Sequence, residues 1–335
     1  MSNTIVVDID GILTLETYGY GKNYYPRRTP NYYNIETLKD YKKRGFKITL
    51  YSARYKEDLK MTEGWLKRNK VPYDSLILGK PQADFYVDDK AINQLDREVL
   101  CFSGGVDSVI AWHYLNFPQP IYVMMGHKYQ LKETNCIGKL KKLIPKLKSI
   151  IYYNGPELGR FETGPKAYIS QRNFHLALCA SHYGNKIYIV GIKDDKIEDK
   201  NKAAFDVMSF ACNFIRKPGE LNIKICSPFW GMTKSQLIRW FIDSYPMDYV
   251  EKVLKTSVSC YDANTIGSCG NCFSCARKWL ALESAGIKNS HTWFEKDIRK
   301  FKGLNEYVVG IKQGKYNIER AKNTREVLEK YGIWK

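Results

Sequence analysis

The chain has no apolar stretch long enough to cross a bilayer, and its start lacks the basic and long apolar segments of a secretory leader. No internal repeat of fixed period is visible either. With 44% hydrophobic and 26% charged residues, the composition is that of a globular protein, which excludes disorder and collagen-like fibres. We therefore expect a soluble, cytoplasmic protein without a membrane partner.

Acidic side chains are scarce relative to basic ones. The 335 residues include 53 Lys and Arg against 35 Asp and Glu, which gives a formal net charge of +18. Such a charge attracts polyanions, either nucleotides or nucleic acid. The lysines are scattered along the chain, so a basic surface without a nucleic-acid partner is an equally good interpretation.

Cysteine is distributed unevenly. Of the nine cysteines, four lie between Cys260 and Cys275, and the others stand apart in apolar surroundings. This distribution favours a metal site in a reducing compartment over a disulfide framework. The spacing of Cys260, Cys269, Cys272 and Cys275 supplies four soft ligands, so a closed, structural Zn²⁺ site is expected. An Fe–S cluster also accepts four cysteines, but nothing in the sequence requires redox chemistry.

The order of hydrophobic segments predicts an α/β fold with two Rossmann-like parallel-sheet domains, because the length exceeds what one core usually serves. The first domain, residues 1–94, has predicted strands at 5–9, 46–51, 75–78 and 85–87 and helices at 35–44 and 59–70. The pattern restarts near residue 95, with strands at 99–102, 121–125 and 186–190 and helices at 107–115 and 170–181. The second domain covers 95–289, and a helical extension covers 290–335.

Polar side chains follow the predicted strands of residues 1–94. Asp8 and Asp10 lie two apart at the carboxyl end of the first strand, where open parallel sheets place their ligand sites. The ends of the later strands supply Ser52, Lys80, Asp88 and Asp89. Phosphoryl transfer through an aspartyl phosphate needs such a set: a nucleophilic carboxylate, an acid/base carboxylate, a hydroxyl and a lysine on the phosphate, and acids for Mg²⁺.

The strings DIDGILT, SAR and GKPQADFYVDD resemble, in this order, the haloacid dehalogenase superfamily of phosphatases over about residues 1–92. The resemblance implies that Asp8 is the nucleophile and Asp10 the acid/base, with Ser52 and Lys80 on the phosphate. The implied Mg²⁺ ligands are Asp8, Asp10, Asp88 and Asp89. No large cap domain fits into so short a segment, so an open site is expected. The alternative is a retained scaffold without turnover, because function rests on sites and not on folds.

A glycine loop, SGGVDS, joins the predicted strand at 99–102 to the helix that follows. It comprises Ser103, Gly104, Gly105, Val106, Asp107 and Ser108. Glycine N–H groups and a helix N-terminus bind anions, so the loop is predicted to hold phosphate. It has neither the Gly-Lys-Ser/Thr of a Walker loop nor a GxGxxG pattern. It resembles the pyrophosphate loop of ATP pyrophosphatases, and a chance Ser-Gly-Gly turn is the alternative.

Four strings together resemble the 7-cyano-7-deazaguanine synthase (QueC) family over about residues 99–285. They are SGGVDS, ISQRN at 169–173, VSCY at 258–261 and CGNCFSCAR at 269–277. The resemblance implies a ligase of queuosine biosynthesis that uses ATP and Mg²⁺ to adenylylate the carboxylate of 7-carboxy-7-deazaguanine, with Zn²⁺ as a structural ion. In the family, ammonia displaces AMP, and the amide is dehydrated to a nitrile. The implied contacts to ATP are the six loop residues, and those to the substrate are Arg172, Asn173 and Asp194.

The sequence departs from the family after Val190-Gly191-Ile192. The family has an acidic residue and then a Ser-Gly-Tyr-Pro-Asp-Cys-Arg string, whereas this chain runs DDKIEDKNKAAFD from Asp194. GHKY at 126–129 replaces a Gly-Gln-Arg-His-like string, so His127 and Tyr129 either recognise another group or simply pack. These departures leave open a conjugating ligase that passes the activated carboxylate to an amine of a protein or of tRNA, in a defence or modification pathway.

Two other interpretations come from different classes. A tRNA-modifying ATP pyrophosphatase, such as a thiolating enzyme, would explain the charge, although its usual pair of catalytic cysteines is not obvious. A silent nucleotide-binding module would keep ATP and zinc but release no pyrophosphate. Aromatic and basic residues alternate after residue 290, where they either stack on bases or, as we prefer, pack on a neighbouring domain or on a second subunit of a homodimer.

Overall fold

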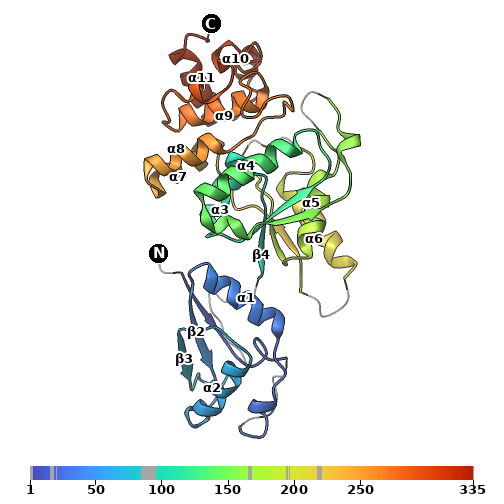
Figure 1. Cartoon of the computed structure of the whole chain (residues 1–335), viewed down its shortest axis with the longest axis vertical. Helices are drawn as coiled ribbons and strands as arrows, with labels where there is room; N and C mark the ends of the chain where they lie inside the picture. Colours follow the sequence, from blue (N-terminus) through green and yellow to red (C-terminus); the bar gives the residue numbers. More distant parts are fainter. Residues whose placement is uncertain are drawn as a thin grey trace. The chain divides into compact units, whose positions relative to one another are not determined.

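The structure, a computed structural model, describes residues 3–15, 19, 21–83, 96–164, 168–193, 195, 197–216 and 221–334. The chain divides into two compact units, Met1–Arg97 and Glu98–Lys335 (Figure 1). Each unit is built on an all-parallel sheet, so the predicted α/β class is confirmed. The predicted strand at 85–87 and the candidate residues Asp88, Asp89 and Asp194 lie outside the described residues.

The first unit has a three-stranded sheet in the order β1-β2-β3. Its elements are β1 (Thr4–Val7), η1 (Tyr25–Arg27), α1 (Tyr32–Lys43), β2 (Lys47–Ser52), η2 (Lys56–Asp58), α2 (Leu59–Arg68) and β3 (Ser75–Leu78). The register pairs Val7 with Leu50 and Ser52 with Leu78, so the carboxyl ends of the three strands lie at one edge. Apolar residues of α1 and α2 bury the sheet in a single small core: Ile35, Leu38, Trp65 and Leu66.

The second unit has a five-stranded sheet in the order β6-β5-β4-β7-β8. The strands are β4 (Glu98–Cys101), β5 (Gln119–Met124), β6 (Ile151–Asn154), β7 (Lys186–Tyr188) and β8 (Lys224–Cys226). The first half of the sheet grows outward from β4 through β5, and the second half grows in the opposite direction through β7. The carboxyl end of β4 is therefore the point where the order reverses, which is where open α/β sheets bind ligands.

Helices cover both faces of this sheet. They are α3 (Val106–Tyr114), α4 (Gln130–Leu143), α5 (Arg172–Ser181) and α6 (Lys202–Phe214). The next helices pack on these helices and on one another: α7 (Lys234–Ser244) on α3, α8 (Met247–Thr256) on α4, and α9 (Phe273–Ser284) on α7. Figure 1 shows α3 and α4 on one side of β4, and α5 and α6 on the other. Successive strand residues point to opposite faces, so Val99 enters the core beneath α5 and α6 while Leu100 enters the larger core with α3 and α4.

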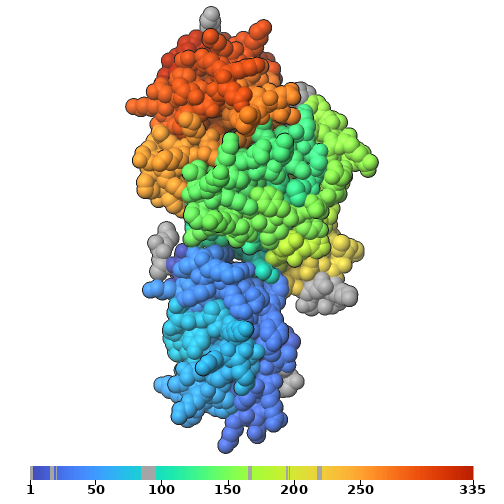
Figure 2. Space-filling model, in the orientation of Figure 1, coloured from blue at the N-terminus to red at the C-terminus, as the bar shows by residue number. Residues whose placement is uncertain are grey.

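Two further helices, α10 (Leu304–Lys312) and α11 (Ile318–Lys330), follow α9. Their buried residues Leu304, Val327 and Leu328 belong to the same hydrophobic core as Trp279 of α9. In the space-filling view the red C-terminal residues form a continuous surface with the orange segment before them (Figure 2). The C-terminal helices are thus packed into the second unit and share its hydrophobic core.

None of the helices in the described part of the chain is both long and apolar enough to span a bilayer.

Candidate active site and metal centre

The SGGVDS loop joins β4 to α3 at the reversal point of the second sheet. Gly104 has a φ of +74°, and a Cβ there would lie 3.1 Å from Ile137 and 3.2 Å from the Cys136 sulfur, so only glycine suits the position. The Ser103 hydroxyl accepts the Gly105 N–H at 3.3 Å and lies 3.3 Å from the Ser108 hydroxyl. The loop is therefore a turn with its polar groups gathered at the N-terminus of α3, an arrangement that binds anions.

Asp107, in the first turn of α3, meets a lysine from a distant part of the chain. Its Oδ2 lies 2.9 Å from the Nζ of Lys234, and the Lys234 side chain is only 10% exposed. Burial lowers the pKa of Lys234, and the Asp107 carboxylate opposes this shift. The other oxygen of Asp107, Oδ1, is buried and has no hydrogen-bond partner among the described residues.

The position of Lys234 is set by the start of α7. The sequence Thr-Lys-Ser-Gln predicts a capping box, and the structure confirms it: the Thr233 hydroxyl accepts the Gln236 N–H, and the Gln236 side chain accepts the Thr233 N–H. Lys234 is therefore the first residue of the helix, directly after its cap.

Asp195 forms a second buried ion cluster. Its side chain is 2% exposed and lies 2.8 Å from Arg277 of α9 and 2.9 Å from Lys200. Burial alone would raise the pKa of this carboxyl, but the two cations outweigh burial and hold the pKa far below its usual range. Asp195 is therefore a fixed anion that orients Arg277.

A single cavity of about 230 Å³ brings these groups together. Among its lining residues are four of the loop, Ser103, Gly105, Asp107 and Ser108, the predicted substrate residues Arg172 and Asn173, and the charged group Asp195, Lys200, Lys234 and Arg277. Gly104 and Val106 are not among the residues that line it in the described part of the chain, because Gly104 faces α4 and Val106 is fully buried in the core. A cavity of this size has room for part of a nucleotide.

The end of the cavity near Arg172 is aromatic. Arg172 donates to the Tyr129 hydroxyl at 2.6 Å, and the Tyr129 ring lies 5.0 Å from the ring of Tyr261. Burial raises the pKa of Tyr129, so this phenol stays neutral. His127 lies against Tyr129 with ring centroids 4.2 Å apart, and its Nε2 is 3.1 Å from Glu133. This end of the cavity suits a flat ring that carries a carboxylate, because the aromatic side chains can contact the ring and the Arg172 guanidinium can pair with the carboxylate.

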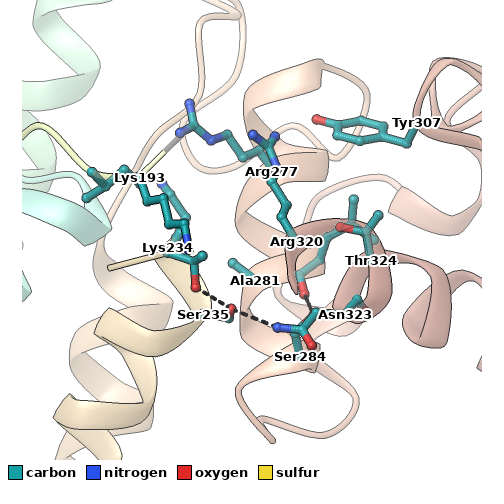
Figure 3. A pocket seen from close by; sticks show the side chains of 13 residues that line it. Lys193, Lys234, Ser235, Arg277, Ala281, Ser284, Tyr307, Arg320, Asn323 and Thr324 are labelled. Carbon is teal, nitrogen blue, oxygen red and sulfur yellow. Dashed lines mark hydrogen bonds between the residues drawn. The ribbon is translucent and has the colours of Figure 1, made fainter. Parts of the chain in front are cut away.

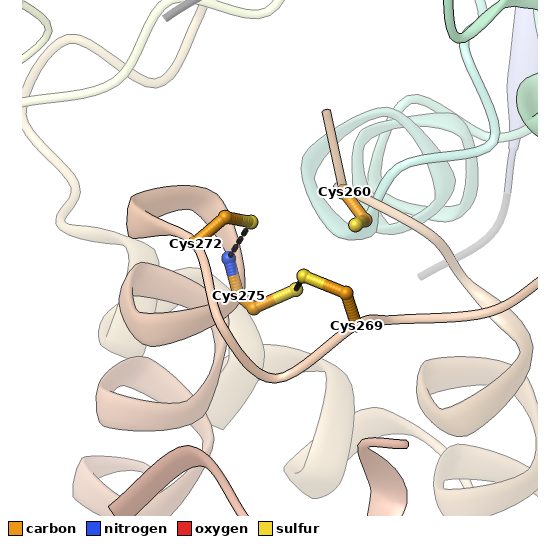
Figure 4. Close-up of side chains that lie close together, drawn as sticks. All are labelled: Cys260, Cys269, Cys272 and Cys275. Carbon is orange, nitrogen blue, oxygen red and sulfur yellow. Dashed lines mark hydrogen bonds between the residues drawn. The ribbon is translucent and has the colours of Figure 1, made fainter. Parts of the chain in front are cut away.

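The four clustered cysteines converge on one point. The sulfurs of Cys260, Cys269, Cys272 and Cys275 all lie within 4.8 Å of one another. Figure 4 shows Cys272 and Cys275 at the start of α9, Cys269 on the loop before it and Cys260 opposite. A tetrahedral Zn²⁺ with Zn–S bonds of about 2.3 Å needs sulfurs about 3.8 Å apart. The Cys269 and Cys275 sulfurs are 3.9 Å apart, so the cluster fits one zinc ion.

Donors around the sulfurs favour their thiolate forms. The N–H of Asn271 points to the Cys269 sulfur at 3.2 Å, and the N–H of Cys275 points to that of Cys272 at 3.4 Å. The ammonium of Lys132, buried on α4, lies 3.5 Å from the Cys260 sulfur. Hydrogen bonds to the ligand sulfurs orient them and offset the negative charge of four thiolates.

In the first unit, the strand ends bring three of the predicted residues to one edge. Lys80 lies 3.1 Å from the Oδ2 of Asp8, and its N–H donates to the Ser52 carbonyl at 3.0 Å. The acid/base candidate Asp10 is held by a bidentate pair to Arg54, with both N···O distances 2.8 Å, and lies 3.4 Å from Arg28. Both arginines are buried, so the two charges that face Asp10 are part of the fold.

No motif in the sequence singles out several of these residues as members of a site. Lys234 and Arg277 lie inside motifs noted for another reason, a helix cap and the cysteine run, and only the fold brings them to the loop. Asp195 follows the candidate Asp194, and sequence alone offered no way to choose between two adjacent aspartates. Arg54 is the last residue of the SAR string, and Arg28 carries no motif.

One family model matches part of the second unit. Residues 156–286 match the family model described as queuosine biosynthesis protein QueC. A 7-cyano-7-deazaguanine synthase of Chlorobaculum parvum is 25% identical over 220 residues, which cover 57% of this chain and 93% of that protein. A 7-cyano-7-deazaguanine synthase of Chlorobaculum tepidum is 24% identical over 220 residues, which again cover 57% of this chain and 93% of that protein. The chain thus contains a QueC-like region.

Among solved structures, the crystal structure of an MCSG target from Vibrio cholerae is 31% identical to this chain. It covers 28% of this chain and 83% of the other, with a TM-score of 0.22. At this TM-score the likeness does not bear on fold or function.

Proposed function

We propose that residues 98–335 form an ATP-dependent ligase that adenylylates the carboxylate of a 7-deazaguanine, such as 7-carboxy-7-deazaguanine, and transfers the acyl group to an amine. The observation that carries the proposal is the shared cavity, in which the SGGVDS loop faces Arg172, Lys234 and Arg277. The QueC-like region and the two synthases to which the chain is similar support the same reaction class.

The chain's own residues suit the steps of this reaction. The loop and Lys234 would hold the phosphates, and the unpaired, buried Oδ1 of Asp107 suits a Mg²⁺ ion that accompanies ATP. A carboxylate oxygen of the substrate attacks the α-phosphorus, and the bond to the pyrophosphate oxygen breaks. The amine then attacks the acyl carbon and loses a proton, and AMP leaves. Lys234 and Arg277 would stabilise the charge that builds up on the leaving pyrophosphate.

We assign recognition of the deazaguanine base to the aromatic end of the cavity, near Arg172. Tyr129 and Tyr261 would hold the flat bicyclic ring, and Arg172 would pair with the carboxylate, since its guanidinium already donates to Tyr129 in this cavity. Asn173 would act indirectly, because its side chain and N–H both donate to Asp199 and thereby fix the loop before α6.

The decisive experiment is an incubation of the full chain with ATP, Mg²⁺, 7-carboxy-7-deazaguanine and ammonia, followed by mass spectrometry with AMP and pyrophosphate assays. An amide or nitrile together with AMP supports the proposal as stated. AMP that depends on the deazaguanine but yields no small-molecule product would move the search to a protein or tRNA amine as the acceptor. No AMP with any carboxylate would reject the ligase.

We further propose that the first unit is a phosphatase, with Asp8 as the nucleophile. The ion pair between Lys80 and Asp8 supports this, because a lysine beside the nucleophile can also hold the phosphate that is transferred. Asp10 can act as acid/base only after Arg54 has released it, so a substrate phosphate would have to compete for that guanidinium. Phosphate release from a panel of mononucleotides and sugar phosphates with Mg²⁺, compared with Asp8→Asn, tests this second proposal.

A further inference from the structure

Glu133 differs from the other carboxylates that line the described part of the loop cavity. Asp107 is paired with Lys234, and Asp195 is paired with Arg277. Figure 3 shows these two cations, Lys234 on α7 and Arg277 on α9. No Lys or Arg of the described residues forms an ion pair with Glu133, which faces only an imidazole. Of the three carboxylates, Glu133 is therefore the one whose charge is left for a ligand.

Glu133 is held in place through one of its two oxygens. It lies in the first turn of α4, where its Oε2 accepts the Tyr122 hydroxyl at 2.9 Å and lies 3.1 Å from the Nε2 of His127. Burial raises the pKa of Tyr122, so this phenol keeps its proton and acts as the donor. The Glu133 side chain is 18% exposed, and no described residue donates to its Oε1. A positioned carboxylate thus presents one open oxygen at the cavity.

Glu133 and Arg172 carry opposite charges at the same aromatic end of the cavity. Arg172 donates to the Tyr129 hydroxyl at 2.6 Å. On the other side of Tyr129, the ring of His127 lies 4.2 Å away and turns its Nε2 to Glu133. The two charged groups do not pair with each other. A ligand beside Tyr129 therefore meets a cation and an anion at separate points.

The substrate proposed above has groups that match both charges. Its carboxylate can pair with the Arg172 guanidinium. A different edge of the same ring carries two adjacent donors, the N1–H and the 2-amino group. A carboxylate oxygen has two lone pairs, and hydrogen bonds to an ionised acceptor are the stronger kind. The open Oε1 of Glu133 therefore suits this edge of the base.

From this juxtaposition we infer that Glu133 determines specificity for the base, because its Oε1 accepts hydrogen bonds from the N1–H and 2-amino edge. This inference rests on the proposed ligase reaction and its deazaguanine substrate. Tyr122 and His127 are positioning residues, since they contact Oε2 and thereby fix the direction of the carboxylate. A ring without the 2-amino group leaves Oε1 partly unpaired, and a site built for a hydrogen bond discriminates against such a ligand.

The test is calorimetric titration of the full chain with two ligands, in the presence of Mg²⁺ and α,β-methylene-ATP, which releases no pyrophosphate. The ligands are 7-carboxy-7-deazaguanine and 7-carboxy-7-deazahypoxanthine, which lacks only the 2-amino group. The unaltered chain should bind the first about 30-fold more tightly, the effect of one charge-assisted hydrogen bond. Glu133→Gln keeps the size of the side chain but has no charge and adds a donor. The ratio of the two affinities should therefore fall to about threefold or less.

Two matched variants separate recognition of the base from a general loss of binding. Arg172→Gln should weaken both ligands by the same factor, because the carboxylate that it would contact is common to both. Glu157→Gln is an exposed change at a residue outside the described cavity lining, so it should leave both affinities unchanged. If Glu133 has only a structural role, Glu133→Gln weakens both ligands alike, and the unchanged ratio overturns the inference.

The comparison of the two ligands on the unaltered chain needs no variant, so it decides the matter even if Glu133→Gln does not fold. Equal affinities for the two ligands overturn the inference. A ratio that depends on Glu133 in a chain that forms no AMP upholds the base site and rejects the ligase. If neither ligand binds but another carboxylate supports AMP formation, the base site is rejected and adenylylation is kept.

Discussion

The Nζ of Lys234 lies 2.9 Å from the Oδ2 of Asp107, although the two residues belong to helices far apart in the chain. Asp107 is in the first turn of α3, which the glycine loop opens, and Lys234 is the first residue of α7 behind its capping threonine. The ion pair thus ties the glycine loop to the start of α7. It also gives the loop a cation that its own sequence lacks.

Asp107→Asn should lower the rate of AMP formation by about 100-fold or more, because the variant loses the carboxylate charge that pairs with Lys234 and that would hold a cation at the cavity. Pyrophosphate release under saturating ATP measures this effect. Glu251→Gln, an exposed change of the same kind on α8, should leave the rate unchanged. If the Asp107→Asn protein keeps more than a third of the original rate, Asp107 is not part of the active site.

Cys272→Ser should cost fold stability before it costs chemistry, because the free energy of zinc binding is also folding free energy. We expect loss of the bound zinc by elemental analysis and a melting temperature lower by many degrees. Cys226→Ser on β8, outside the cluster, should keep its zinc and most of its stability. A Cys272→Ser protein that melts normally without zinc would contradict a structural role for the metal.

His113 should make the second unit less stable as the pH falls from about 6.5 towards 4. Burial in an aromatic cluster with Phe117, Phe241 and Tyr249 lowers its pKa to about 4, from 6.5 in the unfolded chain. The unfolded state therefore binds the proton first. The stabilisation from neutral His113 is fully present above pH 6.5 and is lost as the pH falls from 6.5 to 4. Below pH 4 it changes no further. The loss in the free energy of unfolding amounts to roughly 3 kcal/mol.

Urea unfolding at several pH values measures this effect. His113→Gln lacks the titrating ring, so its free energy of unfolding should be lower at neutral pH but should vary less between pH 6.5 and 4. If both proteins show the same slope over this window, other groups carry the acid sensitivity.

Asp8→Asn should abolish any phosphatase activity of the first unit, since an amide cannot form the aspartyl phosphate. Adenylylation by the second unit should continue, because the loop cavity is lined by residues of that unit. Glu57→Gln, an exposed change in the first unit, serves as the control. Equal phosphate release by Asp8→Asn and the unaltered chain would reject the phosphatase.

The described elements that hydrophobic periodicity predicted lie near their observed bounds, whereas β6, β8, α4 and α6 were not predicted. The strand at 75–78 is found as predicted, and the helix predicted at 107–115 is α3, Val106–Tyr114. Local signals are sufficient here because side-chain burial alternates with the period of each element. The helix predicted at 170–181 begins later, at Arg172, because Gln171 adopts a left-handed conformation that ends the preceding turn.

The sequence by itself determined the motifs whose groups are close together in the chain. The SGGVDS loop, the Thr233 cap and three of the four cysteines, Cys269, Cys272 and Cys275, lie within short segments, so their geometry follows from local backbone rules.

Only the tertiary structure decided which distant charges meet. It brings Lys234 to Asp107 and Arg277 to Asp195. These pairings depend on how α7 and α9 pack around the sheet, and ridge-into-groove packing is set by the summed shape of many side chains. A charged residue in a sequence carries no mark of the partner that it will face, so this part of the site had to come from the fold.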